Sequence, residues 1–184
     1  MRTIFKKAKV MKKIVRYGSL GSELRPKYWK RITDQENMLA EVRDLAGLTG
    51  ADTQSDASSS LYWTIIAKIE AEEAAMEASE EFKKDACNRL TIQIRDEIEK
   101  DLHRTKTSAR IETKEGQGEM RNVLLAVAYC LPEIGYCQGM NFIASCLIAI
   151  TDSEEQGFII FMYLLLKKDM KTLFIPVSTR CDVT

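Results

Sequence analysis

The chain has 184 residues, 45% of them hydrophobic, which is enough for one domain with a buried core. Its 27 basic and 27 acidic residues cancel, so no global field favours nucleic acid or an acidic ligand. The longest apolar runs, residues 142–150 and 158–166, are far shorter than the roughly 20 residues of a membrane-spanning helix, and no secretory signal is visible.

The cysteines predict small buried side chains in a reducing compartment and not a disulfide framework. Their number is odd, none forms a Cys-x-x-Cys pair of the metal-binding type, and three lie inside apolar helix patterns. They are Cys87, Cys130, Cys137, Cys146 and Cys181.

Residues 1–17 predict a basic lead-in helix. Residues 1–16 carry seven Lys or Arg and no acid, and their apolar residues recur at helical spacing. Two functional interpretations are open: the helix lies on an anionic membrane, or it targets mitochondria. The apolar face is narrow and has no Trp, which favours a third: it docks on the domain with its lysines in water.

Residues 35–48 carry apolar residues at helical spacing and predict an amphipathic helix. Residues 49–60 are polar and predict a loop. From Leu61 a helical pattern runs for about forty residues, and its acidic, Ala-rich stretch at 70–81 predicts a break into two helices and a solvated face. The expected buried positions are Met38, Leu39, Val42, Leu45, Ala46, Trp63, Ile66, Ile69, Met76, Leu90, Ile94 and Ile98.

The segment from Ile98 to Thr105 closes this pattern. Asp101 shares a helix face with Ile98, and Arg104 lies one further turn along, where we expect the helix to end. A carboxylate at this spacing can hold the guanidinium through a charge-assisted contact. The alternative is an ordinary surface ion pair, worth about 0.3–0.5 kcal/mol. His103, the only histidine, has no nucleophile or second ligand around it in the sequence and is interpreted as incidental.

Two strongly apolar helices are predicted at 120–131 and 139–150, with a tight corner between them. Gly116 and Gly118 predict a turn before the first of them. Pro132 cannot continue that helix. Gly135 allows the chain to turn tightly at a position where a side chain would not fit. The corner then presents Gln138, which can both donate and accept hydrogen bonds. The alternative is a capped, buried helix start with a polar residue satisfied locally.

Ser153, with Gln156 three residues later, predicts a capping box for a helix over 154–168. Pro176 stops whatever follows, and residues 177–184 look like a tail. No strand-type alternation and no internal repeat is present in the sequence. The fold class is therefore predicted as all-α, an irregular helical array and not a regular bundle.

Three short patterns follow one another along the chain: Arg25-x-x-x-Trp29, Ile98-x-x-Asp101-x-x-Arg104 and Tyr136-x-Gln138-Gly139. In this order they resemble those of the TBC domain family, the GTPase-activating proteins for Rab GTPases. The likeness covers residues 18–176, so the predicted organisation is a lead-in helix at 1–17, a partial TBC-like domain at 18–176 and a tail at 177–184. It departs from the family at residues 18–20, which read Gly-Ser-Leu in place of Gly-Ile-Pro, and after Thr105, where an aromatic-proline pair is missing.

This resemblance implies a Rab-family GTPase in its GTP-bound state as the partner. Arg104 would stabilise the charge of the transition state, an effect of about 10³–10⁵ in rate, and Gln138 would orient the attacking water. Asp101 would hold Arg104, and Tyr136 would pack beside Gln138. The remaining motif positions would support the site (Thr105 and Gly139) or the fold (Arg25, Trp29 and Ile98).

By the same resemblance the protein is an activator with no chemistry of its own, and it needs no metal or cofactor because GTP and Mg²⁺ belong to the GTPase. It has no Gly-x-x-x-x-Gly-Lys-Ser/Thr loop, which argues against its being the GTPase itself. The expected location is cytoplasmic, in vesicle trafficking, with residues 1–16 as a candidate contact with endomembranes.

The alternative function is a catalytically inactive or truncated TBC module that binds a Rab as a scaffold. Family members normally continue into a second helical half, whereas 46 residues follow Gln138 here (184 − 138). An incomplete half is expected to leave apolar faces such as residues 158–166 uncovered.

Overall fold

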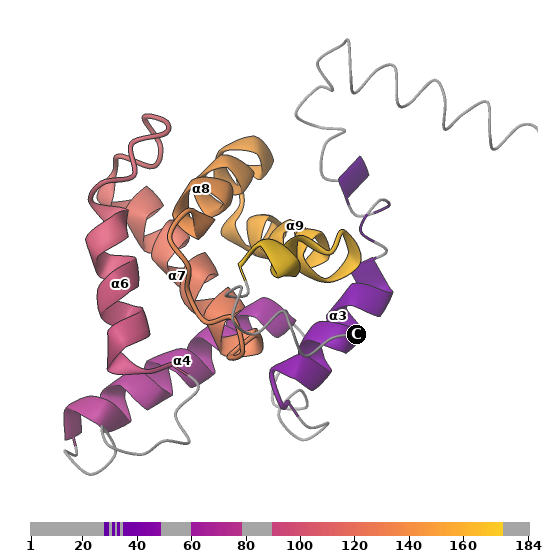
Figure 1. The fold of residues 1–184 in the computed structure, drawn as a ribbon, viewed down its shortest axis with the longest axis horizontal. Helices are drawn as coiled ribbons and strands as arrows, with labels where there is room; N and C mark the ends of the chain where they lie inside the picture. Colours follow the sequence, from indigo (N-terminus) through magenta and orange to yellow (C-terminus); the bar gives the residue numbers. More distant parts are fainter. Residues whose placement is uncertain are drawn as a thin grey trace, which may run out of the picture.

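The computed structural model describes residues 28–29, 31, 33, 35–48, 60–78 and 90–174. This part of the chain is helical and contains no strand, which confirms the all-α fold class (Figure 1). The helices are α3 (Gln35–Leu45), α4 (Leu61–Ala78), α6 (Ile92–Leu102), α7 (Lys114–Cys130), α8 (Met140–Thr151), α9 (Glu154–Lys167) and the short 3₁₀ helix η1 (Met170–Leu173).

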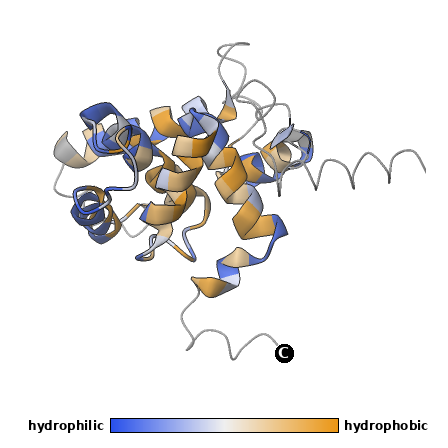
Figure 2. Cartoon of the chain, turned by 90° about the horizontal axis from the view of Figure 1, so that it is seen from above, coloured by the Kyte–Doolittle hydropathy of each residue, from blue (hydrophilic) through white to orange (hydrophobic). Residues whose placement is uncertain are grey.

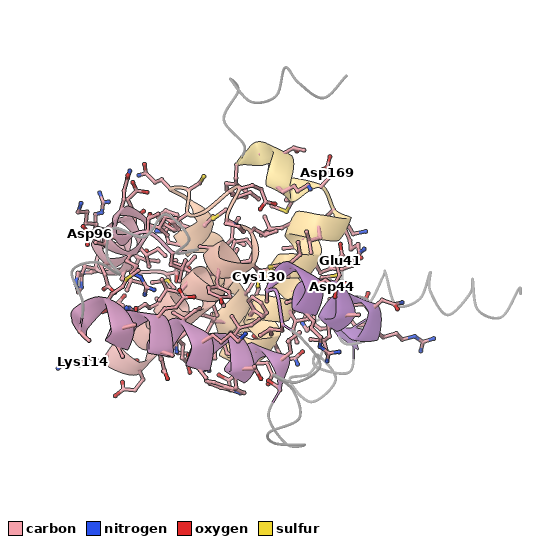
Figure 3. The ribbon with its side chains drawn as sticks, turned by 90° about the horizontal axis from the view of Figure 1, so that it is seen from below. Glu41, Asp44, Asp96, Lys114, Cys130 and Asp169 are labelled. Atoms are coloured by element: carbon pink, nitrogen blue, oxygen red, sulfur yellow. The ribbon has the colours of Figure 1, made fainter. Side chains whose placement is uncertain are left out.

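Helix α7 lies at the centre of the array and contacts α4, α6, α8 and α9. Every residue from Val123 to Cys130 is buried, so this half of the helix is apolar on all sides, as expected for a helix enclosed by others. Hydrophobic residues gather on the helices in the middle of the molecule (Figure 2), and Figure 3 places Cys130 inside while Asp96 and Lys114 lie at the periphery.

The prediction of a turn at Gly116 and Gly118 is wrong, because both glycines lie inside α7. The helix begins after Thr113, whose hydroxyl accepts a hydrogen bond from the Gly116 amide at 3.0 Å. A Cβ at Gly116 would lie 2.1 Å from the carbonyl oxygen of Arg110. The glycine therefore marks a close approach of the preceding segment to the helix, and not a turn.

The predicted buried face of α4 is correct at Ile66, Ile69 and Met76 and wrong at Trp63, which is 43% exposed. Its neighbour Tyr62 is buried instead, where it packs on Phe158 and donates a 2.8 Å hydrogen bond to Glu154 Oε2. A buried tyrosine needs such a partner for its hydroxyl. The predicted face of α4 is therefore kept, except that Tyr62 takes the buried place expected for Trp63.

The interpretation of the acidic run as a solvated face is wrong at Glu73. Its carboxylate is half-buried and pairs with Arg95 of α6 and, at 2.7 Å, with Arg121 of α7. Arg121 also pairs with Glu99. These four side chains join α4, α6 and α7. Helix α4 continues through the acidic run to Ala78, so the predicted break is absent from residues 70–78, and residues 79–81 lie outside the described part of the chain.

The expectation of an uncovered apolar face at residues 158–166 is wrong for α9. Phe158 to Met162 and Leu165 are buried, because α3, α4, α7 and α8 all pack on this helix. Its start is as predicted: Ser153 caps it and accepts a 3.4 Å hydrogen bond from the Gln156 amide. At the other end Lys167 pairs with Glu41 of α3 at 2.6 Å.

Helix α3 confirms the amphipathic pattern, with Met38, Val42 and Ala46 buried. Its end is fixed by Gly47, whose φ of 64° lets Leu48 donate back to the Arg43 carbonyl at 3.1 Å. Among the described cysteines Cys130 is buried as predicted, but Cys137 is half-buried and Cys146 is exposed.

Several predictions fall outside the described residues: the lead-in helix, Arg25, the loop at 49–59, Cys87, Cys181, Pro176 and the tail. Within the described chain, every helix falls short of the length and apolarity that a bilayer crossing requires.

Candidate functional site

The end of α6 places Arg104 on the surface above a buried carboxylate. The helix is capped at its start by Thr91, and it runs to Leu102 with Ile98 and Asp101 facing the core. The amide of Arg104 then donates to the Asp101 carbonyl at 3.3 Å, so the chain leaves the helix through a tightened last turn. The Arg104 side chain is 67% exposed and that of Asp101 only 8%.

The carboxylate of Asp101 has a partner at each oxygen. Oδ1 contacts Nη2 of Arg104, as the spacing predicts, and Oδ2 accepts a 2.7 Å hydrogen bond from the Tyr136 hydroxyl. Nε of Arg104 donates to the Lys100 carbonyl at 3.2 Å. An ordinary exposed ion pair leaves both side chains free to rotate. Here the buried partner fixes the guanidinium from below.

Burial, and then the neighbouring Asp101 carboxylate, raise the pKa of the Tyr136 phenol well above its ordinary value. The phenol therefore stays protonated and donates to Asp101 throughout the neutral range. This contact joins residues 35 positions apart, and the motif spacing did not predict it.

The corner between α7 and α8 presents Gln138. Helix α7 ends at Cys130 ahead of Pro132, and Gly135 follows with a φ of 61°, where a Cβ would lie 3.1 Å from Cδ1 of Ile94. The predicted tight corner is present. Gln138 is exposed, and within the described residues its side chain makes no hydrogen bond to another group.

The residues around Gln138 are anchored. Before it, the Cys137 thiol donates to the Phe174 carbonyl at 3.3 Å, and burial raises the pKa of this thiol. After it, Gly139 has a φ of 104° and begins α8. Its amide donates to Oδ1 of Asn141 at 3.1 Å. The glutamine is thus an exposed side chain between two anchored residues.

A second connection runs between the two loops, through residues that sequence reasoning missed or left without a role. Nδ2 of Asn141 donates to the Thr105 hydroxyl at 2.7 Å, and that hydroxyl donates to the Asp101 carbonyl at 2.7 Å. Both side chains are buried. In the sequence, the role of Asn141 is indicated only by the position of a polar carboxamide side chain in the first turn of a strongly apolar helix.

The structure therefore gathers most predicted site residues into one unit and leaves two aside. Asp101, Arg104 and Thr105 at the end of α6 meet Tyr136 and Gly139 of the corner, with Gln138 between the last two. Ile98 lies beneath in the core, and Trp29 packs on the core half-buried. In the part of the chain that is described, no group of three or more His, Cys, Asp or Glu could hold a metal ion.

Comparison with known proteins matches residues 22–183 to the Rab-GTPase-TBC domain. Small G protein signaling modulator 3 of Homo sapiens is 40% identical over 78 residues, 41% of this chain and 10% of that protein. GTPase-activating protein GYP3 of Saccharomyces cerevisiae is 38% identical over 86 residues, 42% of this chain and 13% of that protein. Growth hormone-regulated TBC protein 1 of Homo sapiens is 55% identical over 42 residues, 23% of this chain and 12% of that protein.

The matched segments thus span about a tenth of the length of these relatives. The family match, by contrast, extends over most of this chain and includes every described helix. The chain belongs to the Rab-GTPase-TBC domain family.

Proposed function

We propose that this chain is a GTPase-activating protein for a Rab-family GTPase in its GTP-bound state, and that it supplies Arg104 and Gln138 to the nucleotide site of that partner. The observation that carries the proposal is the buried carboxylate of Asp101, which ties the loop of Arg104 to the loop of Gln138 through Tyr136. An arginine that acts in the nucleotide site of a partner must be held in a productive orientation, and this carboxylate orients Arg104.

Arg104 is oriented and still has donors to offer. Its contacts within the described residues use Nε and Nη2, which leaves the two N–H donors of Nη1 for a phosphate of the partner. The guanidinium is always charged and presents its donors in a rigid fork that suits phosphate oxygens. In trans, such an arginine accelerates hydrolysis by about 10³–10⁵, which corresponds to roughly 4–7 kcal/mol of barrier.

Gln138 complements this charge with a neutral group. Its amide can accept from the attacking water and donate to a phosphate oxygen. The exposed side chain stands on a backbone that Tyr136, Cys137 and Gly139 hold by their own contacts. We assign it the orientation of the water. The nucleotide and Mg²⁺ belong to the GTPase, so this chain contributes side chains only.

The proposal places the protein in vesicle trafficking, peripheral on endomembranes. What supports this is the excess of seven basic residues and no acid in residues 1–16, since anionic lipid attracts such segments. Co-sedimentation with vesicles containing phosphatidylserine, compared for the full chain and a chain lacking residues 1–16, tests it. Equal binding of the two would remove the membrane contact from the proposal.

Single-turnover hydrolysis tests the catalytic proposal. A panel of GTP-loaded Rabs is mixed with the wild-type chain, with Arg104→Ala and with Arg43→Ala, whose arginine is exposed on α3 away from the site. We expect stimulation of at least one Rab by wild type and Arg43→Ala and none by Arg104→Ala. Equal rates with wild type and Arg104→Ala would remove the catalytic role. Rab binding without any stimulation would instead identify a scaffold module.

A further inference from the structure

Asn141 lies where the two loops of the site meet. It occupies the first turn of α8 and is 3% exposed, with apolar residues on either side of it in the helix. Its side chain makes two contacts in different directions. Oδ1 accepts from the Gly139 amide at 3.1 Å, and Nδ2 donates to Oγ1 of Thr105 at 2.7 Å.

The Thr105 hydroxyl determines the direction of its hydrogen bond with Asn141. A hydroxyl carries one proton, and here that proton goes to the Asp101 carbonyl at 2.7 Å. Thr105 can therefore only accept from Asn141, so the amide nitrogen is required. An aspartate at 141 would place a carboxylate oxygen against an oxygen that has no proton left to give.

We propose that Asn141 is a positioning residue that sets the spacing between Arg104 and Gln138. This inference rests on the function proposed above. Thr105 directly follows Arg104, and Gly139 directly follows Gln138, so one side chain contacts the residue next to each group: the hydroxyl of Thr105 and the amide of Gly139. The backbone at Gly139, with φ at 104°, has a conformation that glycine adopts readily and other residues do not.

A change in this spacing acts on the rate more than on binding. A displacement of about 1 Å at reacting groups can lower a rate by roughly 10²-fold. Asn141 and Thr105 are buried, so they offer almost no surface to a partner, and the affinity for the GTPase should stay as it is. The rate loss caused by a change at Asn141 should also depend on Gln138, because the distance between Arg104 and Gln138 cannot affect the rate once Gln138 is removed.

The experiment measures single-turnover GTP hydrolysis by a Rab that the wild-type chain stimulates, as a function of chain concentration. Asn141→Ala is compared with Asn122→Ala, a half-buried asparagine that donates to Glu154 at 3.2 Å away from the site. Thr105→Val deletes the accepting hydroxyl, and Thr105→Ser keeps it. Asn141→Ala is also made in the Gln138→Ala background.

We expect Asn141→Ala and Thr105→Val to lower the saturating rate by at least about tenfold, with the half-saturating concentration unchanged. Thr105→Ser and Asn122→Ala should retain the wild-type rate. In the Gln138→Ala background, Asn141→Ala should cause no further loss, since groups that act as a unit are non-additive. If Asn141→Ala shows no cooperative unfolding transition, the Thr105→Val and Thr105→Ser pair decides.

Three results would overturn the inference alone: a wild-type rate for Asn141→Ala, equal losses for Thr105→Val and Thr105→Ser, or losses at 141 and 138 that multiply as independent effects. A wild-type chain that stimulates no Rab would be a different failure. It would overturn the proposed function, and the positioning role with it.

Discussion

The hydroxyl of Tyr136 lies 2.7 Å from Oδ2 of Asp101, the carboxylate that holds Arg104 at its other oxygen. The tyrosine of one motif thus supports the arginine of another motif. A single carboxylate couples two loops that are 35 residues apart in the chain. The role of Asp101 in this arrangement can be separated from its effect on folding.

Asp101→Asn should lower the stimulated hydrolysis rate by at least about tenfold, because the loss of charge releases the guanidinium while the amide oxygen can still accept from Tyr136. Single-turnover kinetics measures this. Asp96→Asn, an exposed aspartate on the same helix, is the matched control and should keep the full rate. If both variants match wild type, Asp101 does not hold Arg104 in a productive position.

Gln138→Ala should reduce stimulated hydrolysis and leave folding untouched. The side chain is exposed and has no hydrogen-bond partner among the described residues, so its removal should change stability by less than about 0.5 kcal/mol. Glu133→Ala alters an exposed residue of the same corner and should keep the rate. Urea unfolding and single-turnover kinetics together check both statements. A large loss of stability with Gln138→Ala would contradict the picture of a free side chain.

The raised pKa of Tyr136 predicts a pH dependence of stability. The ordinary value is 10.0, so the unfolded chain ionises this phenol from about pH 10 while the folded chain keeps it neutral. Its stabilisation is complete below that pH and is lost as the pH rises above it, by up to about 1.4 kcal/mol per pH unit. Urea unfolding from pH 8 to 11 should show a shallower decline for Tyr136→Phe than for wild type. Tyr163→Phe, which changes a half-buried tyrosine of α9, is measured beside it as the matched substitution.

Gly116→Ala and Gly118→Ala should change stability in opposite directions, although both lie in α7. An alanine normally stabilises a helix interior by about 0.5–1 kcal/mol relative to glycine. This gain is expected at 118, where a Cβ meets no atom within 4 Å. At 116 the Cβ would lie 2.1 Å from the Arg110 carbonyl oxygen, so the clash outweighs the gain. Urea midpoints of the two variants measure the difference, and a stabilised Gly116→Ala would show that the close approach is not real.

The sequence alone was sufficient for features that depend on local spacing. The contact of Asp101 with Arg104 follows from a separation of three residues, and the cap at Ser153 and the tight corner at Gly135 follow from residue type. The helices α8 and α9 were predicted within one residue of their observed ends, because apolar periodicity and local breakers determine such boundaries.

Features that depend on distant partners were not predictable in this way. Tyr62 and Trp63 are adjacent aromatic residues, and the choice of which one is buried depends on Glu154, 92 positions away from Tyr62. Asn141 needs Thr105 as its acceptor before its role becomes visible. Gly116 was assigned to a turn because its close contact with the Arg110 carbonyl cannot be seen in the sequence.

The central claim is that Arg104 enters the nucleotide site of a Rab when the phosphoryl group is being transferred. The most direct measurement is the affinity of the chain for a GDP-loaded Rab with and without aluminium fluoride, which with GDP mimics the transition state. We expect the wild-type chain and Arg43→Ala to bind at least about 10²-fold more tightly when the mimic is present, and Arg104→Ala to show no such increase. An equal increase for Arg104→Ala, or none for the wild-type chain with any Rab, would contradict the claim.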